Sequence, residues 1–212
     1  WPDGHIRVTG REYNGLLESA CYQRGEMSCV SCHSMHKSDP DDQLARGMRT
    51  NKACLQCHDN MAGDLTAHTR HTAGSAGSNC YNCHMPHTSY GLLKAIRGHT
   101  IETPNVATTL ETGRPNACNL CHLDKTLDWT AEQLAKRTGQ AKPTVPADHR
   151  TTAASALWLL KGDAGQRALA AWHMGWQSAL EASGTGWQSP LLAELLNDPY
   201  SAVRYMAHKA LA

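Results

Sequence analysis

The chain has 212 residues, enough for one large domain or two small ones, and its 20 Lys and Arg against 19 Asp and Glu leave a net charge of +1. This balance lacks the basic footprint of a nucleic-acid binder, and no apolar run approaches the roughly 18 residues needed to cross a bilayer. With 17 Gly, 9 Pro and no Phe, the chain is poorly supplied for an ordinary core, yet it carries 9 Cys and 13 His. We therefore expect something other than side chains to fill part of the interior.

Eight of the nine cysteines fall into four pentapeptides of the form Cys-x-x-Cys-His, at Cys29–His33, Cys54–His58, Cys80–His84 and Cys118–His122. Random shuffling of this composition would give about 0.02 such pentapeptides per chain. The pattern is the attachment signature of a c-type haem, in which two thiols reach the porphyrin vinyl groups and the imidazole binds iron. We predict four covalently attached haems. The predicted attachment residues are Cys29, Cys32, Cys54, Cys57, Cys80, Cys83, Cys118 and Cys121, and the predicted iron ligands are His33, His58, His84 and His122.

Other uses of paired cysteines fit this pattern poorly. Four-cysteine zinc sites and disulfides do not require a histidine after every second cysteine. Thioredoxin-like redox chemistry needs strands and helices alternating around the motif, and no such pattern flanks these four. The ninth cysteine, Cys21, is interpreted as a small buried hydrophobic residue with no assigned chemistry.

Nine further histidines exceed the four imidazoles needed to complete the irons. His36 follows His33 by three residues and so lies on the same side of a helical turn, which means that it can bind only a neighbouring haem. We predict that the distal ligands are His36, His68, His71 and His99. His5, His87 and His173 remain open as ligands, His173 also as a core residue, and Met could replace a distal histidine. Histidine on both sides of each iron is the favoured interpretation.

The expected fold class is mainly α. Residues 1–139 contain short segments broken by Gly, Pro, Asn and Asp, which predicts a haem-cored cytochrome domain of short helices and loops. Pro143 and Pro146 predict a linker over 140–150. Residues 151–212 predict two helical hairpins, with an Asp163 and Gln166 capping box at the second helix and an apolar stripe that continues to Leu180.

Several segments together resemble bacterial multihaem cytochromes c that carry a helical repeat tail. These are Glu26–His36, Cys80–Pro86, Arg97–His99 and Arg114–His122. Asn197–Arg204 resembles the second helix of a HEAT-type repeat. The resemblance implies an exported electron carrier, in the periplasm or outside the cell. The first residue is Trp and the last helix shows no stop signal, so we expect a removed signal segment or a longer parent chain.

Three functions are compatible with these motifs. The first is electron transfer between protein donors and acceptors, with no catalytic residue. The second is an enzyme resembling nitrite reductases or hydroxylamine oxidoreductases, in which one haem iron keeps an open position. The third is self-assembly into an extracellular filament, or membership of a larger cytochrome complex, which adds to the first. The supply of histidines favours filled irons and therefore electron transfer.

Overall fold

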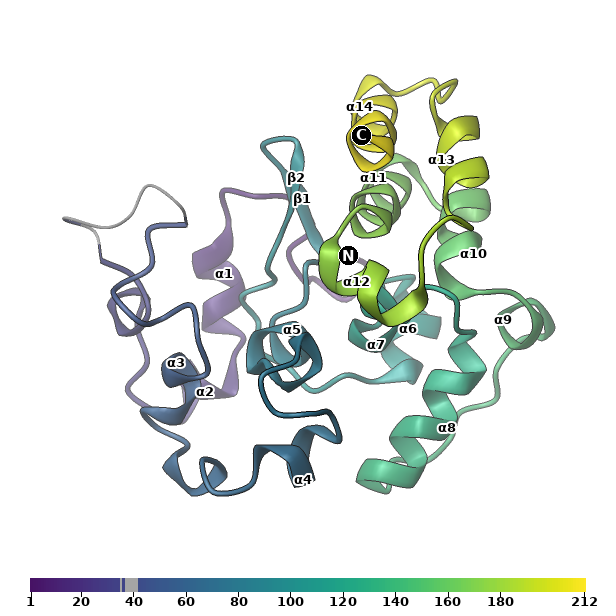
Figure 1. The fold of residues 1–212 in the computed structure, drawn as a ribbon. Helices are drawn as coiled ribbons and strands as arrows, with labels where there is room; N and C mark the ends of the chain where they lie inside the picture. The colour runs from purple at the N-terminus through teal and green to yellow at the C-terminus, as the bar shows by residue number, and fades with distance from the viewer. Residues whose placement is uncertain (35, 37–41) are drawn as a thin grey trace. The chain divides into compact units, whose positions relative to one another are not determined.

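The computed structural model describes residues 1–34, 36 and 42–212. As predicted, the protein is mainly α-helical (Figure 1). The chain divides into two compact units. We call residues 11–85 and 99–103 the three-motif unit, and residues 1–10, 86–98 and 104–212 the one-motif unit, after the pentapeptides that each contains. No helix among the described residues has the length and apolar character needed to cross a membrane.

The three-motif unit consists of short helices joined by loops. Its elements are α1 (Glu12–Leu17), α2 (Ala20–Gln23), η1 (Cys29–Ser31), α3 (Lys52–Leu55), η2 (Asp59–Met61), α4 (Leu65–Thr69), η3 (Ala76–Ser78) and α5 (Cys80–His84). Helices this short are not stable by themselves in water, so tertiary contacts must hold them in place.

The one-motif unit holds the longer helices and a small sheet. Its elements are β1 (Ser89–Gly91), β2 (Lys94–Ile96), α6 (Val106–Thr112), α7 (Ala117–Cys121), α8 (Leu127–Thr138), α9 (Ala147–Thr151), α10 (Ala154–Lys161), α11 (Ala164–Met174), α12 (Gln177–Ser183), α13 (Ser189–Leu195) and α14 (Ser201–Leu211). The two strands are antiparallel, with Ser89 opposite Ile96 and Gly91 opposite Lys94. The sheet is a difference from the sequence analysis, which expected helices and loops alone in this region.

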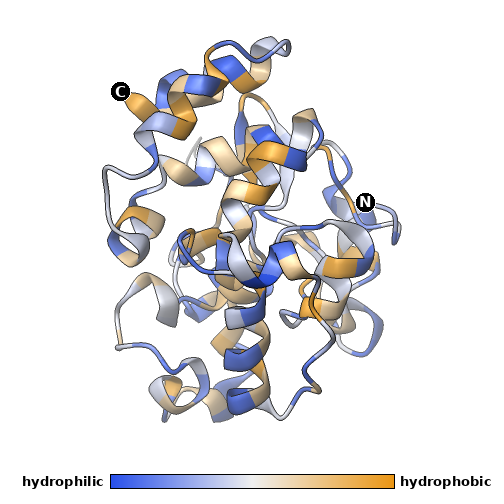
Figure 2. Ribbon diagram, turned by 90° about the vertical axis from the view of Figure 1, so that its right-hand side faces the viewer, coloured by the Kyte–Doolittle hydropathy of each residue, from blue (hydrophilic) through white to orange (hydrophobic). Residues whose placement is uncertain are grey.

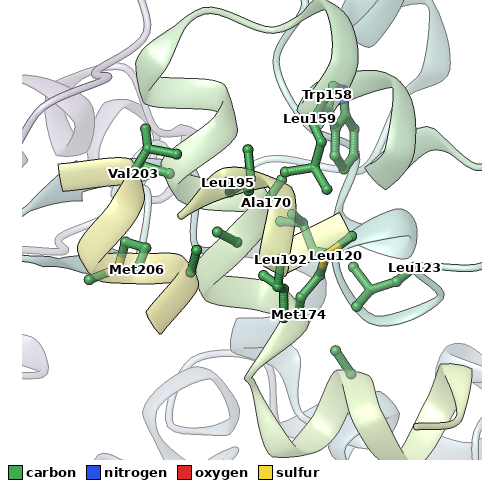
Figure 3. Close-up of a cluster of buried hydrophobic side chains, with 14 of the residues drawn as sticks. Leu120, Leu123, Trp158, Leu159, Ala170, Met174, Leu192, Leu195, Val203 and Met206 are labelled. Atoms are coloured by element: carbon green, nitrogen blue, oxygen red, sulfur yellow. The ribbon is translucent and has the colours of Figure 1, made fainter. Parts of the chain in front are cut away.

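The main hydrophobic core of the one-motif unit lies among α7, α10, α11, α13 and α14 (Figure 3). Met174, Val203 and Met206 are at most 1% exposed there. The helices carry hydrophobic residues on one side and hydrophilic residues on the other (Figure 2), as their amphipathic sequence pattern predicts. Full burial of each such side chain stabilises the fold by about 2 kcal/mol.

The capping box predicted for the second tail helix is present. Asp163 Oδ1 accepts hydrogen bonds from the main-chain N–H of Gly165 (2.9 Å) and Gln166 (3.1 Å). The Gln166 side chain accepts in return from the Asp163 N–H at 2.9 Å. The two side chains thereby satisfy donors that the first turn of α11 leaves without helical partners.

The apolar stripe over residues 169–180 does not belong to one helix, contrary to the sequence analysis. Helix α11 ends at Met174, and α12 begins at Gln177. A Cβ atom at Gly175 would lie 2.8 Å from Ala210 Cα of α14, so only glycine permits this approach of two backbones. The break between α11 and α12 therefore coincides with the contact between Gly175 and α14. The sequence around Gly175 gives no sign of this contact.

The short helix α9 begins within the stretch 140–150 and ends at Thr151, while Pro143 and Pro146 precede it. Both prolines thus avoid a helix interior, where proline is unfavourable. The division into a haem domain over 1–139, a linker and a separate helical domain over 151–212 remains a prediction about which parts fold as domains.

A buried ion pair fixes the entry to α14. Asp198, 8% exposed, accepts hydrogen bonds from Arg167 Nε at 2.6 Å and Nη2 at 3.1 Å, and from the Tyr200 N–H at 2.9 Å. The Arg167 guanidinium therefore holds the pKa of the Asp198 carboxyl below its usual range. Because folding favours the ionised form, this stabilisation is present above the unfolded-state pKa of about 3.9 and is lost as the pH falls through the folded-state value.

We expect Asp198→Ala to lower the free energy of unfolding at pH 7 by about 2 kcal/mol, since it removes charge-assisted hydrogen bonds from a partly buried arginine. Denaturant titration followed by far-ultraviolet circular dichroism measures the change. Asp148→Ala is the control, because it breaks an ion pair with Lys161 whose two side chains are 35% and 65% exposed. Equal midpoint shifts in the two variants would contradict the assigned importance of the Asp198 pair.

Candidate haem-binding sites

Each pentapeptide is built on one helical turn. The histidine N–H donates to the carbonyl of the first cysteine at 2.9 Å in the first motif, 3.0 Å in the second and 2.9 Å in the fourth. In the third motif, helix α5 runs from Cys80 to His84. Since residues three and four positions apart share one face of a helix, each turn presents both thiols and the imidazole to the same side. This is the arrangement that attachment of one porphyrin requires.

The fourth motif is anchored to the core by its two intervening residues. Asn119 is fully buried, its Oδ1 accepts a hydrogen bond from Thr130 Oγ1 at 2.7 Å, and its Nδ2 donates to the Lys125 carbonyl at 3.1 Å. Leu120 is 2% exposed and belongs to the main core. The ring of Trp129 lies 5.1 Å from that of His122, at 58°. Core packing therefore fixes the turn from which Cys118, Cys121 and His122 project.

The motifs of the three-motif unit are joined by side-chain amides. Gln56, inside the second motif, donates to the Ser31 carbonyl of the first motif at 3.1 Å. Asn51 accepts from the Cys80 N–H of the third motif at 2.9 Å and donates to the Ser78 carbonyl at 2.8 Å. These bonds fix the relative positions of the three motifs in this unit.

All nine cysteines are free thiols in the structure. Burial, followed by the neighbouring Cys80 thiol, raises the pKa of Cys54 to about 12, and burial is the first cause that raises the pKa of Cys32. Both thiols are therefore held mainly in the protonated form at pH 7.

Two of the motif histidines face a histidine that the sequence analysis selected as a distal ligand. The ring centres of His33 and His99 are 6.2 Å apart with an interplanar angle of 19°, and those of His68 and His84 are 6.1 Å apart at 14°. A metal–imidazole bond is about 2 Å long and the nitrogen lies about 1.1 Å from its ring centre, so two imidazoles across one iron have centres about 6 Å apart. Both pairs therefore fit an axial pair of haem ligands.

The ring of His84 is oriented by a main-chain contact. His84 Nδ1 donates to the Glu102 carbonyl at 2.8 Å, and the Glu102 N–H donates to the His84 carbonyl at 3.0 Å. Burial lowers the pKa of His84, against the raising effect of the Glu102 hydrogen bond. The neutral ring with its proton on Nδ1 carries its lone pair on Nε2, as haem ligation requires.

One short segment serves both imidazole pairs. Residues 99–103 carry His99, which faces His33, and Glu102, which binds His84. Between them Ile101 has a φ of 51°, a left-handed conformation that is strained for a β-branched residue. The strained residue Ile101 thus lies between the two residues of segment 99–103 that contact the proposed haem sites.

The other two predicted distal ligands are placed differently. His71 is partly buried, and its Nδ1 donates to the Thr69 carbonyl at 2.7 Å. His36 is exposed, its carbonyl accepts a hydrogen bond from Ser34 Oγ, and its neighbours 35 and 37–41 lie outside the described residues. Of the motif ligands, His58 is exposed and His122 is partly buried.

His87 and His173, left open by the sequence, belong to an aromatic cluster. Their ring centres are 6.1 Å apart at 63°, and the ring of Trp172 lies 5.0 Å from His87 and 4.9 Å from His173. Trp176 also packs against both, at 5.2 Å and 5.8 Å. The two indoles therefore pack close to both imidazoles, and ligation of iron by His87 or His173 stays a prediction.

His173 is fully buried within this cluster, and its Nδ1 donates to the Leu169 carbonyl at 2.7 Å. Burial lowers the pKa of His173 to about 4, so the ring is neutral at pH 7. The position agrees with the interpretation of His173 as a core imidazole. Trp172 and His173 are adjacent in α11, and Trp176 follows shortly after as the residue before α12. Nothing in the sequence indicates that His87 joins them.

Sequence reasoning missed the residues that hold the ligands. Glu102 contacts His84 through its main-chain carbonyl, so the identity of its side chain does not indicate this contact. Gln56 and Asn51 are ordinary polar residues in the sequence, and only the fold shows their contacts between motifs. Arg114, which precedes the fourth motif, is buried and forms an ion pair with Asp3 at 3.3 Å. The abundance of histidine suggests candidate ligands, but it carries no information about these partners.

The residues present thus fit covalently bound c-type haem in their donor types and in the spacing of two imidazole pairs. In comparisons with known proteins, residues 22–63, which contain the first two motifs, match the family model described as doubled CXXCH motif. No curated protein and no solved structure matches the chain. The family match supports a relationship to multihaem c-type cytochromes, which function in electron transfer.

Proposed function

We propose that the protein is a tetrahaem c-type cytochrome that transfers electrons through closely spaced haems with histidine on both sides of each iron. The observation that carries the proposal is the pairing of His33 with His99 and of His84 with His68 at about 6 Å, the separation that two metal–imidazole bonds require. In this proposal the cysteines of the four motifs hold the haems, and no residue is catalytic.

The haem, when bound, supplies one-electron redox chemistry. The chain's own residues supply orientation and environment. The Glu102 carbonyl keeps the proton of His84 on Nδ1, and the amides of Gln56 and Asn51 hold neighbouring attachment points at fixed positions. Fixed ligands on both sides of an iron reduce the rearrangement that accompanies a change in its charge, which suits electron transfer.

The proposal extends to the setting of the protein. Covalent c-type haem is typical of exported proteins, so we place the protein in the periplasm or outside the cell, with redox proteins as donors and acceptors. Helices α10 to α14 are proposed to form a HEAT-like tail, supported by the packing of α11 against α14 and of α13 against α14. Such a tail offers a surface for self-assembly or for a larger cytochrome complex.

The purified protein is expected to carry the mass of four haems and to show only low-spin iron. Mass spectrometry of the denatured chain counts the covalent haems, and electron paramagnetic resonance with a carbon monoxide titration reports the open positions. A mass without four haems contradicts the tetrahaem proposal. A high-spin haem that binds carbon monoxide supports instead the reductase with one open iron.

The two imidazole pairs make a separate prediction about ligands. His99→Ala and His68→Ala should each retain the mass of the haems and convert one low-spin haem to a high-spin haem that binds carbon monoxide, because each removes one axial imidazole. His208→Ala, which changes an exposed residue of α14, is the control and should leave all haems low-spin. Unchanged spectra in both His99→Ala and His68→Ala would show that these pairs are not axial ligands.

A further inference from the structure

Gly77 lies in η3, between the proposed ligand His71 and the third haem motif. A Cβ atom built on Gly77 would lie 2.2 Å from His71 Cδ2, 2.4 Å from Cγ and 2.8 Å from Nε2. Real Cβ atoms do not approach other heavy atoms this closely. The imidazole of His71 therefore rests directly on the Gly77 backbone, in space that any other side chain would occupy.

The backbone conformation does not explain this glycine. Glycines with positive φ occur elsewhere in the chain, for example Gly74 with a φ of 79°, but Gly77 is not among them. Residue 77 lies in a turn of 3₁₀-helix, a conformation that other residues adopt readily. The contact with the imidazole is therefore the feature of the structure that requires glycine at position 77.

His71 is oriented from its other side as well. Arg70 ends α4 in the left-handed conformation, with a φ of 57°, and so turns the chain after the helix. The His71 N–H then donates to Thr69 Oγ1 at 3.3 Å, and its Nδ1 donates to the Thr69 carbonyl at 2.7 Å. With the proton on Nδ1, the lone pair is on Nε2, the arrangement also found at His84.

The turn beneath His71 is tied to the third haem attachment helix. Asn82, inside the third motif, donates from Nδ2 to the Ala76 carbonyl at 2.8 Å, and Asn51 donates to the Ser78 carbonyl at 2.8 Å. Ser78 Oγ donates to the Ser75 carbonyl at 2.8 Å. Because hydrogen bonds hold both residues that flank Gly77, this turn is a firm support for the ring and cannot easily move away from an added methyl group.

We infer that Gly77 is a positioning residue for a haem, which holds His71 in place as an axial iron ligand. The inference rests on the proposed function, since it takes His71 to be a distal ligand. It assigns a haem-related role to a residue that carries no side chain and cannot itself bind iron. A methyl group at position 77 should displace the imidazole and leave one iron without its sixth ligand.

The test compares the wild-type protein with Gly77→Ala, His71→Ala and the double variant. The mass and the electron paramagnetic resonance spectrum of the wild-type protein are measured first. If the wild-type protein lacks four low-spin haems, the proposed function itself is wrong, independently of Gly77. We expect Gly77→Ala and His71→Ala each to convert one haem in four to a high-spin form that binds carbon monoxide. Gly63→Ala is the matched control, since a Cβ at Gly63 meets nothing within 4 Å.

Four low-spin haems in either Gly77→Ala or His71→Ala would overturn the inference. If Gly77→Ala does not load its haems, the double variant decides the matter, because removal of the imidazole makes room for the methyl group. Recovery of haem loading in the double variant supports a clash with His71. Failure to recover would show that position 77 requires glycine for another reason, and would also overturn the inference.

Discussion

In the proposed function, the three-motif unit depends on one constraint, the separation of two facing imidazoles. An iron between two histidines sets their ring centres about 6 Å apart, and a small displacement of either ring removes the bond. The observed pairs, His33 with His99 and His84 with His68, meet this requirement although their residues come from short elements and loops. Hydrogen bonds from Gln56 and Asn51 fix these segments where a hydrophobic core cannot.

The two imidazole pairs are not independent of each other. Residues 99–103 provide both the ring that faces His33 and the carbonyl that orients His84, and a strained residue, Ile101, lies between them. A displacement of this segment would disturb both pairs. Strain of this kind persists only where the surrounding contacts over-determine the geometry, which agrees with a segment held at both ends by proposed haem sites.

The sequence predicted the parts of this protein whose signals are local. The pentapeptides, the mainly helical fold and the capping box of Asp163 and Gln166 all follow from spacing within a few residues. The break between α11 and α12 could not be predicted, because Gly175 is required by a contact with Ala210, far along the chain. The pairing of distal with motif histidines was left open for the same reason, since it depends on long-range packing.

Glycine illustrates where interpretation of a sequence stops. Gly74 and Gly77 lie three residues apart in one polar loop, and from the sequence both indicate only a break in helix or strand. The structure separates them, because Gly74 adopts a positive φ with open space around it, whereas Gly77 has an ordinary backbone and an imidazole against its Cα. A glycine can thus be needed for the space it leaves as much as for its conformational freedom. Around a large prosthetic group, the ligands must be held without flexibility. A glycine that leaves space for a ligand ring can then be as necessary as the ligand itself.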